Sequence, residues 1–218
     1  MKKRVIALAL GCTVAFGCAV GGTLAWLTAD GGTVTNTFTV GDVKIALTET
    51  GTESGAKNYN FVPGDKLAKD PKVTVQATTE PCYVFLKMTE SNMIKVKDDT
   101  NEDVNALNYE INTSNWFKLT VTNASEGVTY YYKELTAQTT VNTDYYILTG
   151  EGSDVYKNGV VTVSEYVTKD NVSTLTDSQP KLEFAAAAIQ SANVGGLSGA
   201  WAKLPESFKG GATYTGNN

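Results

Sequence analysis

Side chains that commonly act as nucleophiles or bases in enzymes are scarce in this chain. Its 218 residues include no histidine, three cysteines and a single arginine, Arg4. Without histidine, neither a Ser-His-Asp triad nor a Cys-His pair can form, and the imidazole ligands of most catalytic zinc sites are absent. The sequence therefore predicts a protein that is not an enzyme, with no catalytic residue and no cofactor.

The cysteines predict no intramolecular disulfide. Cys12 and Cys18 fall in the apolar N-terminal stretch, which leaves Cys82 alone in the body of the chain. A lone cysteine in an apolar strand usually behaves as a small buried hydrophobe. The body contains neither histidine nor arginine to lower its pKa. We expect Cys82 to be buried and inert.

Carboxylates offer the other possible chemistry. An acidic cluster is formed by Asp98, Asp99, Glu102 and Asp103, and its oxygens are of the type that binds Ca²⁺. The segment lacks the loop glycine and the spaced terminal glutamate of an EF-hand, and a solvated charged loop is the commoner outcome. Calcium binding at this loop stays open, and we assign no metal-binding residue. Paired carboxylates can also hydrolyse glycosidic bonds, but nothing in the sequence brings one particular pair together.

The charge balance argues against nucleic acid as a partner. Removal of the N-terminal cations Lys2, Lys3 and Arg4 leaves 15 of the 18 basic residues against 23 acidic ones, so the formal net charge falls from −5 to −8. The remaining chain then has no arginine for bidentate contacts to guanine or phosphate. We expect no nucleic-acid partner.

Residues 1–25 have the three parts of a secretory signal peptide. A basic start at Lys2 is followed by the uncharged apolar run 5–20 and then by small residues, so a peptidase would cut between Ala25 and Trp26. An uncleaved membrane anchor is the first alternative, but the run is shorter than the roughly 20 residues that a membrane-spanning helix needs. We expect a secreted protein with no membrane contact after processing.

Acylation of Cys18, as in a lipoprotein, is the second alternative to simple cleavage. The residues before it, Val14-Ala15-Phe16-Gly17, fit a lipoprotein signal poorly because the bulky Phe16 stands next to the small residue. We keep acylation of Cys18 as the less favoured alternative.

The body of the chain has the composition and alternation of β-strands. It is rich in Thr, Val and Tyr, which favour pleated, half-buried surface. The clearest runs are Phe38–Val40, Val43–Leu47, Val73–Val75, Cys82–Met88, Phe117–Val121, Val128–Tyr132, Tyr145–Leu148, Gly159–Val163 and Leu182–Ala188. Turn residues separate these runs without a strand–helix rhythm. We predict an all-β fold, an antiparallel two-sheet sandwich with short helical connections.

The same pattern predicts how the chain is organised. A single sandwich domain spans 38–204, since no repeat or low-complexity linker divides it. Within it, 93–108 is expected to form a polar excursion, 164–177 a short helix or irregular connection, and 198–204 a helical turn that sets a tryptophan on the core. The Gly- and Asn-rich tail 205–218 is expected to be flexible and frayed.

Several short segments carry a family resemblance. They are Met1-Lys2-Lys3, Gly21-Gly22-Thr23, Ala25, Asn36-Thr37-Phe38, Gly41-Asp42-Val43-Lys44-Ile45 and Pro63-Gly64-Asp65-Lys66-Leu67-Ala68-Lys69-Asp70. In these segments the chain resembles the TasA/camelysin family of exported bacterial matrix proteins, whose signal peptides are cut by a SipW-type peptidase. The N-terminal third carries nearly all of the likeness, and the rest matches only in general character.

The resemblance implies a jelly-roll-like sandwich that assembles into extracellular biofilm fibres. In the family's fibre form, the N-terminal segment of one subunit is donated as a strand to the next. Here the matching segment is 26–37, and side chains for pockets would come from Trp26, Leu27, Val34 and Phe38. Strand addition derives affinity from the main chain and register from alternate side chains. Head-to-tail donation does not close on itself, so it would propagate as a filament.

Alternatives remain open at this point. The N-terminal segment could instead be a disordered leader or fold back on its own domain, and the protein could be a monomeric secreted adhesin or binding domain. Camelysin-like members have been classed as metallopeptidases, but this chain has no HExxH motif and no histidine. The leading hypothesis is a secreted, non-enzymatic structural subunit that assembles head to tail.

Overall fold

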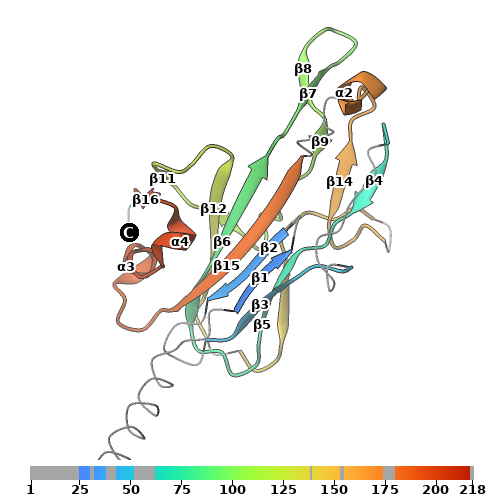
Figure 1. Ribbon diagram of the computed structural model, residues 1–218. Helices are drawn as coiled ribbons and strands as arrows, with labels where there is room; N and C mark the ends of the chain where they lie inside the picture. Colours follow the sequence, from blue (N-terminus) through green and yellow to red (C-terminus); the bar gives the residue numbers. More distant parts are fainter. Residues whose placement is uncertain are drawn as a thin grey trace, which may run out of the picture.

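Figure 1 shows the computed structural model of the chain. The structure describes residues 25–29, 32–37, 43–51, 62–137, 139–152, 155–173 and 180–216. The expected signal peptide up to Leu24 lies outside these ranges, as does Phe38. The fold is mostly β, with 41% strand and 9% helix, so the prediction of a strand-rich chain with short helical connections is confirmed.

The largest sheet has six strands in the order β1-β2-β15-β6-β12-β10. They are β1 (Ala25–Ala29), β2 (Gly32–Thr37), β6 (Cys82–Ser91), β10 (Phe117–Lys118), β12 (Val128–Leu135) and β15 (Lys181–Gln190). Neighbouring strands run antiparallel except β2 and β15, which run parallel. In Figure 1, β6 and β15 cross the middle of the sheet side by side.

The other described strands form smaller antiparallel sheets, with the orders β13-β5-β3, β4-β14-β9, β7-β8 and β11-β16. They are β3 (Ile45–Thr48), β4 (Lys66–Ala68), β5 (Lys72–Val75), β7 (Lys95–Lys97), β8 (Asp103–Asn105), β9 (Leu107–Asn108), β11 (Val121–Thr122), β13 (Thr143–Tyr146), β14 (Val160–Val163) and β16 (Thr213–Tyr214). The helices in the described ranges are α2 (Lys169–Ser173), α3 (Gly196–Ala202) and α4 (Glu206–Lys209).

Strand β6 is buried on both faces because apolar residues occupy successive positions along it. One face carries the alternating residues Cys82, Val84, Leu86 and Met88. These side chains share a core cluster with residues of β3, β5 and β15, so the sheet β13-β5-β3 packs against this face. Full burial of one such aliphatic side chain contributes about 1.5–3 kcal/mol, which makes this cluster the main source of stability for the region.

Helices α3 and α4 cover the opposite face of the six-stranded sheet. Phe85 of β6 and Tyr130 of β12 meet Trp201 of α3 edge to face, with ring centroids 5.8 and 5.1 Å away. Phe208 of α4 lies 6.1 Å from the Tyr130 ring. The expected helical turn that sets a tryptophan on the core is therefore present.

The C-terminal segment differs from the frayed tail that its Gly and Asn content predicts. Residues 205–216 form α4 and β16, with Phe208 4% exposed and Ala212 5% exposed. Burial of these apolar side chains against the sheet outweighs the local flexibility of the glycines. The polar excursion 93–108 is likewise ordered, as the β7–β8 hairpin and β9.

Candidate functional site

The residues predicted for cleavage and strand donation lie in the first two strands. Ala25 and Trp26 begin β1, and Leu27 of β1 pairs with Val34 of β2. The two strands form an antiparallel hairpin at the edge of the chain's own six-stranded sheet. The structure describes the backbone of this hairpin, and the predicted donor residue Phe38 lies outside the described residues.

The hairpin joins the rest of the sheet through β2 and β15. Among the residues that the structure describes, two pairs make this parallel contact, Asn36 with Ala186 and Thr37 with Ala187. On its other side, β15 pairs with β6 through ten residue pairs, from Lys181 to Gln190. The described part of the ladder that attaches the N-terminal hairpin thus lies at the end of β2, and the residues that follow Thr37 are outside the described ranges.

Strand β15 depends on its neighbours to stay extended. Its centre is the run Ala185-Ala186-Ala187-Ala188, and alanine is depleted in strands because it offers little surface for cross-strand packing. Ala186 belongs to the cluster under β3 and β5, and Ala187 to the cluster under α3 and α4. Because both faces are covered, the edge of β15 that receives β2 is the side through which another strand can reach it.

The predicted family turn, Pro63-Gly64-Asp65-Lys66-Leu67, forms a tight turn followed by a strand. Asp65 N–H donates to the Val62 carbonyl at 3.0 Å, and Gly64 has φ of 79°. Proline in the second position and a left-handed glycine in the third are the requirements of a type II β-turn. Gly64 N–H also donates to the Val163 carbonyl at 3.1 Å, which fixes the turn against β14.

The turn leads into β4, where Lys66 forms an exposed ion pair with Glu151 and Leu67 pairs with Val161 of β14. Leu67 packs against the main core cluster. Strand β4 belongs to the sheet β4-β14-β9, whereas β1 and β2 belong to the six-stranded sheet. The structure therefore does not bring the turn motif and the N-terminal hairpin together in one sheet.

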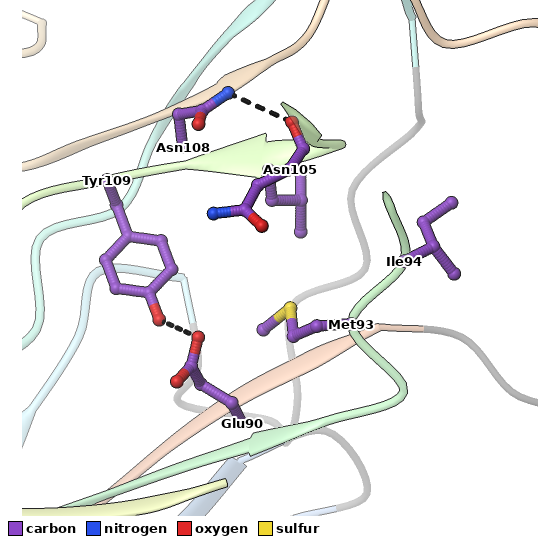
Figure 2. A pocket seen from close by; sticks show the side chains of 7 residues that line it. Glu90, Met93, Ile94, Asn105, Asn108 and Tyr109 are labelled. Carbon is purple, nitrogen blue, oxygen red and sulfur yellow. Dashed lines mark hydrogen bonds between the residues drawn. The ribbon is translucent and has the colours of Figure 1, made fainter. Parts of the chain in front are cut away.

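A hollow of about 220 Å³ lies where β6 ends and the β7–β8 hairpin and β9 turn back (Figure 2). Tyr109 Oη donates a hydrogen bond to Glu90 Oε1 across this hollow. Asn108 Nδ2 donates to the Asn105 carbonyl at 3.3 Å on the facing wall. Met93 completes the wall beside the carboxylate.

The Glu90–Tyr109 pair serves as a polar link between two segments. Burial, and next the hydrogen bond to the Glu90 carboxylate, raise the pKa of Tyr109 well above its ordinary range. The phenol therefore stays protonated and keeps donating at any physiological pH. Sequence reasoning missed this pair, since a glutamate and a tyrosine 19 residues apart match no local spacing rule.

The acidic loop 98–103 is organised by its own hydrogen bonds. Asp98 Oδ1 accepts from Thr100 N–H at 2.8 Å and from Glu102 N–H at 2.9 Å, which closes the turn between β7 and β8. These bonds, led by that from Glu102, lower the pKa of Asp98. Among the described residues, no group of three or more acidic or cysteine side chains is placed to hold a metal ion.

Cys82 is fully buried in the core, as its place in an apolar strand predicts. Burial raises the pKa of its thiol to about 12. Because the thiolate is the reactive form, the thiol has almost no nucleophilic character at neutral pH.

The described part of the chain contains no helix with the length and apolarity needed to cross a membrane. Its longest helix, α3, has seven residues.

The candidate sites are the N-terminal hairpin on β15, the turn at Gly64 and the hollow beside Glu90. In comparisons with protein families, curated proteins and solved structures, nothing matches this chain.

Proposed function

We propose that this chain is a secreted, non-enzymatic subunit of an extracellular matrix fibre and that it assembles by strand exchange at its N-terminus. A SipW-type peptidase would cut between Ala25 and Trp26, which makes the hairpin β1–β2 the new end of the chain. We further propose that the sheets packed around the core form a two-sheet sandwich of the jelly-roll type. The resemblance to the TasA/camelysin family supports both parts of this proposal.

The observation that carries the proposal is that the N-terminal hairpin pairs with β15 through the end of β2. Asn36 and Thr37, the last two residues of the segment 26–37, pair with β15. Each backbone hydrogen bond contributes about 0.5–1.5 kcal/mol net, whether β15 receives it from its own chain or from a second copy. A segment from a second copy that makes the same pairs with β15 would take its place.

Exchange of this kind has a direction. One copy supplies its N-terminal segment and accepts another at β15, so donor and acceptor are different surfaces of the same molecule. Such a heterologous contact does not close by two-fold symmetry and continues as an open filament. Main-chain pairing supplies the affinity, as in other cases of strand addition.

The folded-back hairpin also supports a second candidate, a monomeric secreted adhesin or binding domain. In that case β2 would stay paired with its own Ala186 and Ala187, as the structure has it. The two candidates make opposite predictions about the N-terminal segment. If the protein is a fibre subunit, removal of the N-terminal segment abolishes assembly. If it is a monomeric binding domain, the removal only exposes the edge of β15.

The test compares the chain beginning at Trp26 with one beginning at Phe38, which lacks both strands. We expect the longer chain to form filaments in sedimentation velocity and electron microscopy and the shorter chain to stay monomeric. Circular dichroism establishes that the shorter chain is folded. If both chains remain monomeric over a range of concentration, pH and salt, the fibre proposal is wrong. Turnover of casein or a glycan by either chain would contradict the non-enzymatic assignment.

A further inference from the structure

A second hollow, of about 410 Å³, lies on the helix-covered face of the six-stranded sheet. Three tyrosines from three different strands line it, namely Tyr83, Tyr132 and Tyr214, together with the carboxylate of Glu134. It is larger than the hollow in Figure 2 and richer in aromatic rings, since that one contains the single ring of Tyr109.

The register between β6 and β12 sets the spacing between Tyr83 and Tyr132. Glu134 lies directly opposite Tyr83, and Tyr132 lies opposite Phe85. Tyr83 and Tyr132 are thus diagonal neighbours on one face, which puts their positions about 7–8 Å apart. The ring of Phe117 lies 5.8 Å from that of Tyr132 and supports it from β10.

The third ring comes from β16. Tyr214 is fixed by its pairing with Val121 of β11 and by Gly216, where an added Cβ would stand 2.3 Å from the Tyr214 hydroxyl oxygen. Gly195, Gly196 and Leu197 complete the lining, and a Cβ added at either glycine would meet nothing within 4 Å. The rings are therefore held by their surroundings while the mouth stays clear.

The charge of the hollow is negative. Glu134 is exposed at its rim, and no lysine is among the described residues that line it. Lys133, the nearest cation in sequence, points to the other face, where its Nζ lies 4.5 Å from the centre of the Tyr145 ring. Burial, and next a hydrogen bond to Glu134, raise the pKa of Tyr83, so this phenol stays neutral beside the carboxylate.

We propose that the hollow lined by Tyr83, Tyr132, Tyr214 and Glu134 binds an organic cation of the trimethylammonium class. Aromatic faces attract a cation through their quadrupoles, and cages of such rings recognise quaternary ammonium groups. Glu134 adds a negative charge at the rim. A hollow of this volume holds a small headgroup.

A quaternary cation fits better than a primary one. A lysine-type ammonium is compact and strongly hydrated, and it needs several acceptors to replace its water. The residues that line the hollow include one carboxylate, that of Glu134, beside three tyrosines. A trimethylammonium group has no N–H to satisfy and gains directly from contact with the rings. This inference does not depend on fibre assembly.

The test is equilibrium dialysis of choline against the secreted protein, which works for monomers and filaments alike. The key comparison is 3,3-dimethyl-1-butanol, which has the shape of choline without the charge. We expect choline to bind at least about ten-fold more tightly than this neutral analogue, since only the charged ligand gains cation–π attraction to the rings. Butylammonium separates quaternary from primary cations and should bind more weakly than choline.

Tyr132→Leu and Glu134→Gln should each weaken choline binding several-fold. Two matched controls should leave binding unchanged: Glu126→Gln, in the turn before β12, and Tyr156→Leu, outside the hollow. The proposal is overturned if choline does not bind, if the neutral analogue binds equally, or if the controls weaken binding as much as the site variants. Because filament formation is scored separately, failure here leaves the proposed function intact.

Discussion

The hydroxyl of Tyr130, in the middle of β12, donates a hydrogen bond of 2.5 Å to the carbonyl oxygen of Lys209 at the end of α4. This bond joins the C-terminal segment to the six-stranded sheet across 79 residues of sequence. Together with the buried ring of Phe208, it makes the last part of the chain a structural layer over the sheet. Helix α4 also carries an ion pair between Lys209 and Glu206 at 2.7 Å.

Removal of the buried Phe208 ring from this C-terminal layer should destabilise the whole fold. Phe208→Ala leaves a cavity under α4, and we expect the free energy of unfolding to fall by about 3–5 kcal/mol. Urea denaturation followed by circular dichroism measures this. A change below about 0.5 kcal/mol, typical of exposed sites, would mean that the segment is a loose tail after all.

The hydrogen bond between Tyr109 and Glu90 in the Figure 2 hollow should contribute less to stability than the Phe208 side chain does. Tyr109→Phe removes the donor to Glu90 but keeps the ring. Because the site is partly exposed and water can replace the phenol, we expect a loss of about 1 kcal/mol in unfolding free energy. Tyr156→Phe, at a half-buried position in the turn before β14, is the matched control. Equal effects of the two variants would show that the hydrogen bond has no role in stability.

The turn at Gly64 gives a test of backbone conformation alone. Gly64 has φ of 79°, and an added Cβ would meet nothing within 4 Å. Gly64→Ala should therefore cost about 1–2 kcal/mol through left-handed strain without a steric clash. Gly152 also has open space around it but no left-handed φ, so Gly152→Ala should be close to neutral. If Gly64→Ala is equally neutral, the type II turn is not maintained in solution.

Stability should fall at alkaline pH because of Cys82. Burial raises the pKa of its thiol to about 12, whereas an unfolded cysteine titrates near about 8.5. The folded state thus keeps a proton that the unfolded state loses, so this contribution is complete below about pH 8.5 and declines as pH rises towards 12. The slope per group is about 1.4 kcal/mol per pH unit.

The control for this pH dependence is Cys82→Ala, which removes the titrating group. Urea denaturation between pH 8 and 10 should show a shallower decline for the variant than for the parent chain. Parallel slopes would contradict the assignment. Tyr130, whose pKa burial also raises to about 12, adds a second alkaline loss from about pH 10 upward in both proteins.

The sequence predicts the parts of the fold in which local pattern and burial agree. Cys82 to Met88 alternate in the sequence and alternate between the two faces of β6 in the structure. Trp201 has the helical spacing that places it on the core, and Cys82 is buried as expected. In each case one short segment contains the whole signal.

Prediction fails where a distant partner decides the outcome. The dipeptide Asn158-Gly159 is typical of a hairpin turn, and Gly159 N–H does donate to the Tyr156 carbonyl at 3.1 Å. The flanking strands β13 and β14 nevertheless join different sheets. The polar segment 93–108 is ordered because Val96 and Ala106 pack against Val163 and Val167. No local pattern marks those partners, nor the pairing of Glu90 with Tyr109.

The central claim is that the N-terminal segment exchanges between copies at β15. Neighbouring strands lie about 4.8 Å apart, within the span of a disulfide, so the paired positions Asn36 and Ala186 can report exchange. One chain beginning at Trp26 carries Asn36→Cys and a second carries Ala186→Cys. The native Cys82 is buried in both.

The decisive measurement is non-reducing electrophoresis after these two chains are mixed, allowed to assemble and oxidised. Neither chain can form this disulfide within itself, so a covalent dimer containing one copy of each variant requires exchange. The account predicts that dimer, and its absence when either variant is oxidised alone. If the mixture yields only monomers while a chain carrying both cysteines closes an internal disulfide, the hairpin stays on its own sheet and the account is contradicted.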